Sequence, residues 1–141
     1  MPQPVPYLTF KGNCADAMRF YEKVLGGKIR MMMRTSDSPM AAQCGPDAGD
    51  GIMHADLELE DHSHIYGGDA MPHMPPFNGV QGVSLTLNYD TVPQAEGVFN
   101  ALAKGGNVTM PMGPSFWAKK FGMCVDKFGI SWIVNGERIP A

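Results

Sequence analysis

The sequence lacks three features that would assign a protein to a class at once: paired cysteines, clustered basic residues and long apolar runs. Its three cysteines, Cys14, Cys44 and Cys124, have no CxxC spacing, so we expect free thiols in a reducing cytoplasm. Basic residues adjoin only at Lys119 and Lys120, and the net charge of −3 argues against a nucleic-acid or anionic-membrane partner. No stretch approaches the ~20 apolar residues of a membrane helix.

Several sequence motifs of known chemistry are also missing. The chain contains no GxSxG, HExxH or Walker A sequence, and the N-terminal MPQPVPYLTF does not have the pattern of a secretory signal. No glycine-rich loop joins a strand to a helix, so nothing predicts a seat for a nucleotide or for S-adenosylmethionine, and we expect no cofactor.

An internal repeat is the most informative feature that is present. Segments opening at Leu8 and Leu85 both predict a strand, an amphipathic helix and a Gly-Gly stop. In the first segment Asn13 predicts the helix start, and in the second Asp90 or Thr91 does so. Gly26 and Gly105 are expected to end the two helices as left-handed caps.

Three strand-like runs follow each predicted helix, so each half of the chain predicts a βαβββ module. The runs are 28–34, 52–60 and 64–68 in the first half, and 107–110, 119–125 and 130–135 in the second. Turns are expected at 60–63 and 126–129, and 35–51 is expected to form a long polar loop. We place the first module at about 5–69, a linker at 70–82 and the second module at about 83–136.

Because one helix covers only one face of a module's sheet, the other face needs a partner or a ligand. We therefore expect an α+β fold in which two modules form a curved, eight-stranded mixed sheet around a cleft, within one domain of 141 residues. Twelve methionines and seventeen glycines suit such a shaped interior.

The sequence resembles the vicinal oxygen chelate superfamily, which includes glyoxalase I, bleomycin-resistance proteins and extradiol dioxygenases, and within it the PhnB-like branch. The resemblance spans nearly the whole chain. It rests on segments 7–10, 13–17, 20–21, 25–26, 68–72, 116–118 and 126–129, together with His54 and Trp132. It implies paired βαβββ modules and a homodimer. PhnB-like chains sometimes carry a ubiquinone-methyltransferase label, but both Gly-Gly pairs here follow helices, so the label does not predict an activity.

Enzymes of this superfamily hold a divalent metal on His or Glu ligands from the first and last strand of each module. The corresponding positions here fall near Pro6 or Tyr7, Tyr66 or Gly67, Ser84, and Ile133, and none is a histidine or a carboxylate. Because a catalytic divalent ion needs about three protein ligands, we expect no metal at this standard site.

Candidate ligand-binding residues are His54, Asp69, Trp117, Phe121 and Trp132. His54 alternates with apolar residues along 53–60, as do Asp56, Glu58 and Glu60, which predicts either a polar wall of the cleft or a solvated outer face. Asp69 ends a strand, either as a binding or basic group or as a turn-forming side chain. The two tryptophans offer flat apolar surface with an N–H donor, Trp117 from a loop and Trp132 from mid-strand, where core packing is the alternative.

Two functions remain open from the sequence. The first is a cytoplasmic, homodimeric protein that binds a small, partly apolar molecule in the cleft without the usual metal. The second is an enzyme with a shifted site, in which His54 and Asp69 act as an acid–base pair or as metal ligands. An interaction module with a filled cleft is a third possibility. His62, His64 and His73 have no metal-binding spacing, and His62 and His64 are expected to be exposed beside a turn.

Overall fold

Two units make up the protein, and the described residues of each form one twelve-residue helix and one four-stranded sheet. The computed structural model describes residues 3–37, 51–70 and 78–140. The first unit is Met1–Gly79 and the second is Val80–Ala141. Among the helices of the described residues, none has the length and apolar character needed to cross a membrane.

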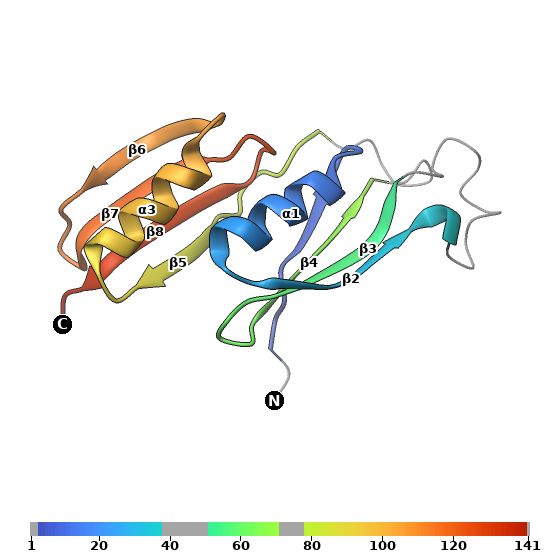
Figure 1. Ribbon diagram of the computed structural model, residues 1–141. Helices are drawn as coiled ribbons and strands as arrows, with labels where there is room; N and C mark the ends of the chain where they lie inside the picture. The colour runs from blue at the N-terminus through green and yellow to red at the C-terminus, as the bar shows by residue number, and fades with distance from the viewer. Residues whose placement is uncertain (1–2, 38–50, 71–77, 141) are drawn as a thin grey trace. The chain divides into compact units, whose positions relative to one another are not determined.

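The first unit follows the order strand, helix, then three strands (Figure 1). Its elements are β1 (Tyr7–Phe10), α1 (Cys14–Leu25), β2 (Lys28–Arg34), the 3₁₀ turn η1 (Thr35–Asp37), β3 (Ile52–Glu58) and β4 (His64–Asp69). The sheet has the order β1-β4-β3-β2, with β1 parallel to β4 and the other pairs antiparallel. We call this sheet 1. Helix α1 covers one of its faces, and no other element among the described residues of this unit covers the second face, which we call the open face.

The second unit repeats the same plan. Its elements are β5 (Leu85–Tyr89), α3 (Val92–Ala103), β6 (Asn107–Gly113), β7 (Ala118–Val125) and β8 (Ser131–Arg138). The order β5-β8-β7-β6, again with one parallel pair, defines sheet 2. The predicted βαβββ repeat and the α+β class are therefore confirmed. The eight strands form two separately bonded four-stranded sheets, and the expectation that both modules form one domain stays a prediction.

Helix α1 begins and ends close to where the sequence predicts. Asn13 is the N-cap residue, although its side chain makes no capping hydrogen bond. Gly26 is the left-handed C-cap with φ of 79°, and its N–H donates to the Glu22 carbonyl oxygen. Ala17, Met18 and Tyr21 are completely buried, so the apolar stripe of the helix forms the core against sheet 1.

The repeated Gly-Gly pairs have two different structural reasons. Gly26 and Gly105 adopt the left-handed conformation, each with φ of 79°. A Cβ atom on Gly27 would lie 2.6 Å from the carbonyl oxygen of Glu58, and one on Gly106 would collide with the backbone of β7 in the same way. The first glycine of each pair therefore makes the turn, and the second lets the chain pass directly beside a neighbouring strand.

A few predicted boundaries differ from the structure. Strand β3 ends at Glu58, so Glu60 lies in the following turn, where His62 has φ of 68°. Helix α3 begins after Thr91, whose side chain accepts from the N–H of Gln94, but its C-cap is the extended Lys104 and not Gly105. Most of the predicted loop at 35–51, including Cys44, and most of the linker at 70–82, including His73, lie outside the described residues.

Candidate functional site on the open face of sheet 1

The open face of sheet 1 carries a row of polar and aromatic side chains. From His54 onward, alternation along β3 buries Ala55 and Leu57 toward α1 and leaves His54, Asp56 and Glu58 on the other face, half-buried. In the antiparallel register Asp56 pairs with Tyr66 and Glu58 with His64. In the parallel pair next to it, Tyr7 lies beside Tyr66. Side chains from three strands therefore share this face.

Three rings on this face form a continuous aromatic cluster, which we call the sheet 1 cluster: Tyr7, His54 and Tyr66. The Tyr7 and His54 rings stack with centroids 5.8 Å apart, and the edge contact between His54 and Tyr66 measures 5.1 Å. Tyr7 retains 51% of its surface exposed, so the cluster is accessible within its unit. Such a surface suits a flat or partly apolar molecule.

The phenol of Tyr7 is fixed at its far end. Its hydroxyl donates to the carbonyl oxygen of Met53 over 3.1 Å and lies over Gly68, where a Cβ atom would approach it to 2.7 Å. Burial, with a smaller effect from the Cys14 thiol, raises the pKa of Tyr7, so the hydroxyl stays protonated and keeps its role as a donor. Gly68 is therefore needed to let the ring lie flat across the sheet.

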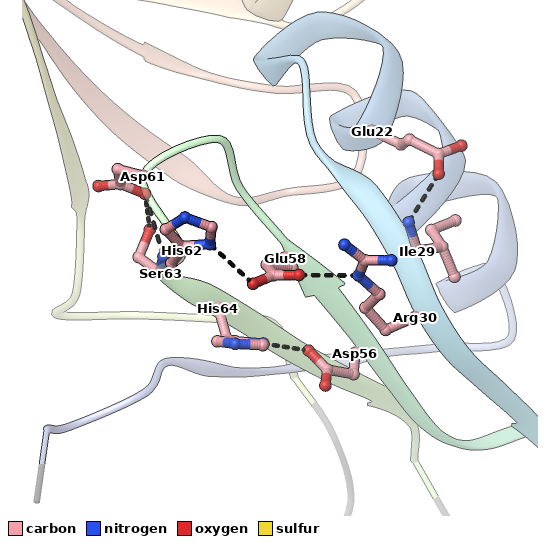
Figure 2. Close-up of polar contacts among 9 residues, drawn as sticks. All are labelled: Glu22, Ile29, Arg30, Asp56, Glu58, Asp61, His62, Ser63 and His64. Carbon is pink, nitrogen blue, oxygen red and sulfur yellow. Dashed lines mark hydrogen bonds and ion pairs between the residues drawn. The ribbon is translucent and has the colours of Figure 1, made fainter.

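Two histidine–carboxylate pairs lie near the cluster, one on β3 and β4 beside Tyr66 and the other at the exposed turn between these strands (Figure 2). Nδ1 of His64 lies 2.7 Å from Oδ1 of Asp56, and both side chains are mostly buried, with 32% and 21% of their surfaces exposed. Glu58 instead accepts from Nε of Arg30 over 2.7 Å and contacts Nδ1 of His62 at 3.2 Å. Hydrogen bonds from His62 and then Arg30 hold the pKa of Glu58 below its ordinary value.

Asp69 does not belong to this site. Its carboxylate accepts the N–H groups of Gly12 and Cys14 at 3.0 and 2.9 Å on one oxygen, and that of Ile52 at 2.8 Å on the other. Asp69 is only 7% exposed and lies on the side of sheet 1 that α1 covers, whereas His54 lies on the open side. The structure therefore does not bring the two residues together, and the acid–base pair expected from the sequence has no geometric support.

The second unit presents a smaller aromatic surface on the open face of sheet 2. Trp117 packs on Phe121 with ring centroids 4.6 Å apart, and Phe116, 87% exposed, meets the edge of Trp117. The indole N–H of Trp117 donates to the side-chain oxygen of Asn135 over 3.0 Å, and the Asn135 amide donates to Asn88. This chain of hydrogen bonds fixes the orientation of the indole ring.

Trp132 lies in the core of the second unit. It is 1% exposed, and its indole N–H donates to Oδ2 of Asp126 over 2.8 Å. The other oxygen of Asp126 accepts from the N–H groups of Phe128 and Ile130, which closes the turn before β8. The alternative of core packing therefore describes Trp132, and we leave it out of the candidate site.

The residues at the superfamily's metal positions do not fit a metal. Tyr66 is part of the aromatic cluster, Ser84 is an exposed residue ahead of β5, and Ile133 lies on β8 with no donor atom. In the described part of the chain, no three His, Cys, Asp or Glu side chains gather closely enough to hold an ion. We therefore derive no chemistry through a metal.

A pocket of about 440 Å³ lies beside the N-terminal half of α1, and the N–H of its lining residue Ile52 donates to Asp69. It is lined by Ala15, Arg19, Met32, Arg34 and Ile52. These β2 and β3 residues are on the helix-covered side of sheet 1, because Met32 pairs with the buried Ala55. The pocket therefore does not open onto the sheet 1 cluster.

Sequence reasoning missed the contribution of His64 to the site. His62 is exposed as expected, with 87% of its side-chain surface free, but His64 turns back along the sheet to Asp56. Alternation along β4 puts His64, Tyr66 and Gly68 on one face, and that pattern was available in the sequence. The sequence alone does not give the register between β3 and β4. This register decides which carboxylate each histidine contacts.

Comparison with known proteins places the chain in a family. The family model described as 3-demethylubiquinone-9 3-methyltransferase matches residues 2–135. Protein YjdN from Escherichia coli (strain K12) is 33% identical in an alignment 140 positions long, which covers 92% of this chain and 92% of YjdN.

Two solved structures of similar proteins cover nearly the full chain. Protein PA1353 from Pseudomonas aeruginosa is 44% identical, with a TM-score of 0.88 over 96% of this chain and 97% of its own. The PhnB protein from Bacillus cereus is 27% identical, with a TM-score of 0.78 over 95% and 98%.

The resemblance to the wider superfamily is confirmed at the level of the fold. A glyoxylase/bleomycin resistance protein/dioxygenase domain from Frankia sp. EAN1pec gives a TM-score of 0.66 at 17% identity, over 96% of this chain and 98% of its own. Taken with the family match over residues 2–135, these likenesses show that the chain belongs to the PhnB-like family described as 3-demethylubiquinone-9 3-methyltransferase, with a glyoxalase/bleomycin-resistance-like fold.

Proposed function

We propose that the protein binds a small, partly apolar molecule on the open face of sheet 1, against the rings of Tyr7, His54 and Tyr66, without the usual metal. The observation that carries the proposal is the continuous ring contact of this cluster on a face that α1 leaves uncovered. Three aromatic rings with polar edges offer stacking together with hydrogen bonding. Trp117 and Phe121 supply a second, separate surface of the same kind.

The test uses para-nitroanisole as a probe, because it has a flat ring and no ionisable proton. We expect binding to the native protein, measured by isothermal titration calorimetry and by shifts of the histidine ring protons in NMR spectra. Substituting Tyr66→Leu removes one of the three rings of the cluster, and we expect affinity to fall about tenfold. Tyr66 is half-buried at the open face, so the fold should persist.

Trp117→Leu is the comparison variant, since it removes an aromatic ring from the separate surface of the other unit. Affinity within about twofold of the native protein is expected for this variant. A loss on Trp117→Leu without a loss on Tyr66→Leu would move the site to sheet 2. Absence of measurable binding by the native protein would overturn the proposal.

We do not propose methyl transfer, although the family description names a methyltransferase. A methyl donor such as S-adenosylmethionine carries a carboxylate, for which the N–H groups at a helix N-terminus are a common seat. Here the N–H groups before and at the start of α1 already donate to the buried Asp69, and the side chain of Thr91 caps α3. Both strand-to-helix connections are thus occupied by the chain's own side chains.

We further propose that the chain forms a homodimer in the cytoplasm, as the superfamily resemblance implies. The two free buried thiols, Cys14 and Cys124, are in keeping with a reducing compartment. Sedimentation equilibrium should give twice the 15.3 kDa of one chain. A mass of one chain at micromolar concentration would contradict the dimer, and recovery in a secreted or membrane fraction would contradict the location.

A further inference from the structure

We infer that His64, oriented by Asp56, accepts a proton from the ligand, so that the site selects a small aromatic compound bearing an acidic hydroxyl group, such as a phenol. This inference rests on the proposed binding surface and adds the chemical class of its ligand. It starts from the 2.7 Å contact between Nδ1 of His64 and Oδ1 of Asp56.

The contact fixes the tautomer of the imidazole. An ionised carboxylate only accepts hydrogen bonds, so Nδ1 must carry the hydrogen and donate it to Asp56. In the neutral ring, Nε2 then holds the free lone pair. Among the described residues Nε2 of His64 has no hydrogen-bond partner. The nitrogen that can take a proton is therefore the one that the protein leaves available.

The neighbouring carboxylates, Glu58 and Asp61, are hydrogen-bonded to other groups (Figure 2). Glu58 lies directly across from His64 in the strand register, yet its oxygens are taken by Arg30 and His62. Asp61 is held in the turn by the N–H and hydroxyl of Ser63. Asp56 is thus the carboxylate that remains to stabilise a positive charge on His64.

Position links the pair to the aromatic cluster. The ring of Tyr66 makes edge contacts with both His54 and His64, at 5.1 and 6.1 Å between centroids. A flat ring lying over Tyr66 therefore has His54 at one edge and His64 at the other. A hydroxyl group on the His64 side of that ring would be directed toward the imidazole.

The proton-transfer step is balanced without any further reactant. The O–H bond of the ligand breaks and its electron pair stays on oxygen, giving a phenolate, while an N–H bond forms at Nε2 and gives an imidazolium. Asp56 stabilises the imidazolium through its existing hydrogen bond, as the carboxylate of a histidine–aspartate pair does. Asp56 acts as a positioning residue, and His64 is the group that touches the ligand.

The experiment compares para-nitrophenol with para-nitroanisole on the native full-length protein. The phenolate of para-nitrophenol is yellow and its neutral form is not, so the absorption spectrum reports whether the bound probe has lost its proton. At a pH just below the probe's own pKa, where neutral histidine is still present, we expect a larger phenolate fraction for the bound probe than for the free probe, and we call this increase the phenolate band. We also expect about tenfold tighter binding than for para-nitroanisole, since only the phenol gains a charge-assisted hydrogen bond.

Three variants separate the pair from its surroundings. His64→Gln should remove the phenolate band and bring the affinities for the two probes within about twofold of each other. Asp56→Asn should weaken the band, because the imidazolium loses its counter-charge while the side-chain shape is kept. His62→Gln, the other histidine of the same turn, is the matched control and should leave the band unchanged.

The possible outcomes distinguish failure of the proton-acceptor inference from failure of the proposed binding function. Binding of both probes with no phenolate band, or a band that persists in His64→Gln, overturns the proton-acceptor inference and leaves the binding surface standing. Failure of both probes to bind overturns both. Binding of para-nitrophenol alone, as a His64-dependent phenolate, keeps the pair and overturns the apolar surface as the main source of affinity.

Discussion

At the scale of single residues, Asp69 shows how a strand-end carboxylate can be a structural anchor. Its two oxygens collect three backbone N–H groups, from Gly12, Cys14 and Ile52, and so join the start of α1 to the start of β3. In Asp69→Asn one acceptor oxygen becomes an N–H₂ group that faces a backbone donor. We expect the free energy of unfolding in urea to fall by about 2–4 kcal/mol.

Asp61→Asn is the control for Asp69, since Asp61 is an exposed turn carboxylate bonded to Ser63. A change within about 1 kcal/mol is expected there. Unchanged stability of Asp69→Asn, together with loss of the phenolate band of bound para-nitrophenol, would instead restore Asp69 as an acid–base residue.

The two cysteines of the described residues are predicted to be unreactive. Burial, with a smaller effect from Asp69, raises the pKa of Cys14 to about 12, and burial with Asp126 raises that of Cys124 to about 11. Because the thiolate is the reactive form, almost none is present near neutral pH. In a Cys44→Ser background, iodoacetamide should alkylate neither thiol of the native protein, as measured by intact mass. Both should be alkylated in denaturant, and rapid alkylation of the native chain would contradict the burial.

At the scale of elements, the turn between β3 and β4 predicts a pH dependence of stability. The folded-state pKa of Glu58 lies below its ordinary value of 4.5 because His62 and Arg30 donate to it. Its stabilising contribution is therefore present above that ordinary value and is lost as the pH falls through the lower folded-state pKa. Native protein should unfold at a higher temperature than Glu58→Gln near neutral pH, and the gap should close in acid. Glu60→Gln, in the exposed turn, serves as the control, and a gap of constant size would refute the linkage.

The second glycine of each Gly-Gly pair gives a prediction on packing. A methyl group on Gly27 would press against the Glu58 carbonyl oxygen, so Gly27→Ala should lower the free energy of unfolding by about 1–3 kcal/mol. Gly97 in α3 has open space around its Cα, so Gly97→Ala should raise that energy by about 0.5–1 kcal/mol. Urea denaturation of the two variants measures both changes in the free energy of unfolding. Equal changes would contradict the close approach at Gly27.

Local sequence patterns predicted the helices and strands well. They predicted poorly which residues each side chain contacts. Gly26, the Thr91 cap and the alternation around His54 are properties of a few neighbouring residues, so the sequence alone carries them. The contact of His64 with Asp56 depends on the register between two strands, and the burial of Trp132 depends on which face α3 covers. Both depend on contacts between residues far apart in the chain, which a single sequence does not specify.

At the scale of the whole molecule, the charge argues against a nucleic-acid partner. The chain carries a net charge of −3, and its adjacent Lys119 and Lys120 are each paired. Nζ of Lys119 lies 2.6 Å from Glu137, and Nζ of Lys120 lies 3.5 Å from Glu96. A phosphate group would have to displace Glu137 to bind Lys119, and Glu96 to bind Lys120.

We therefore expect no binding of fluorescein-labelled duplex DNA at physiological salt, measured by fluorescence anisotropy. The double variant Glu96→Gln, Glu137→Gln frees the two lysines and makes the net charge less negative. It should show weak binding at low salt that disappears as salt is added, because only about two phosphates are neutralised. Micromolar binding by the native protein with a steep salt dependence would show a basic surface that the ion pairs of Lys119 and Lys120 do not account for, and would restore nucleic acid as a partner.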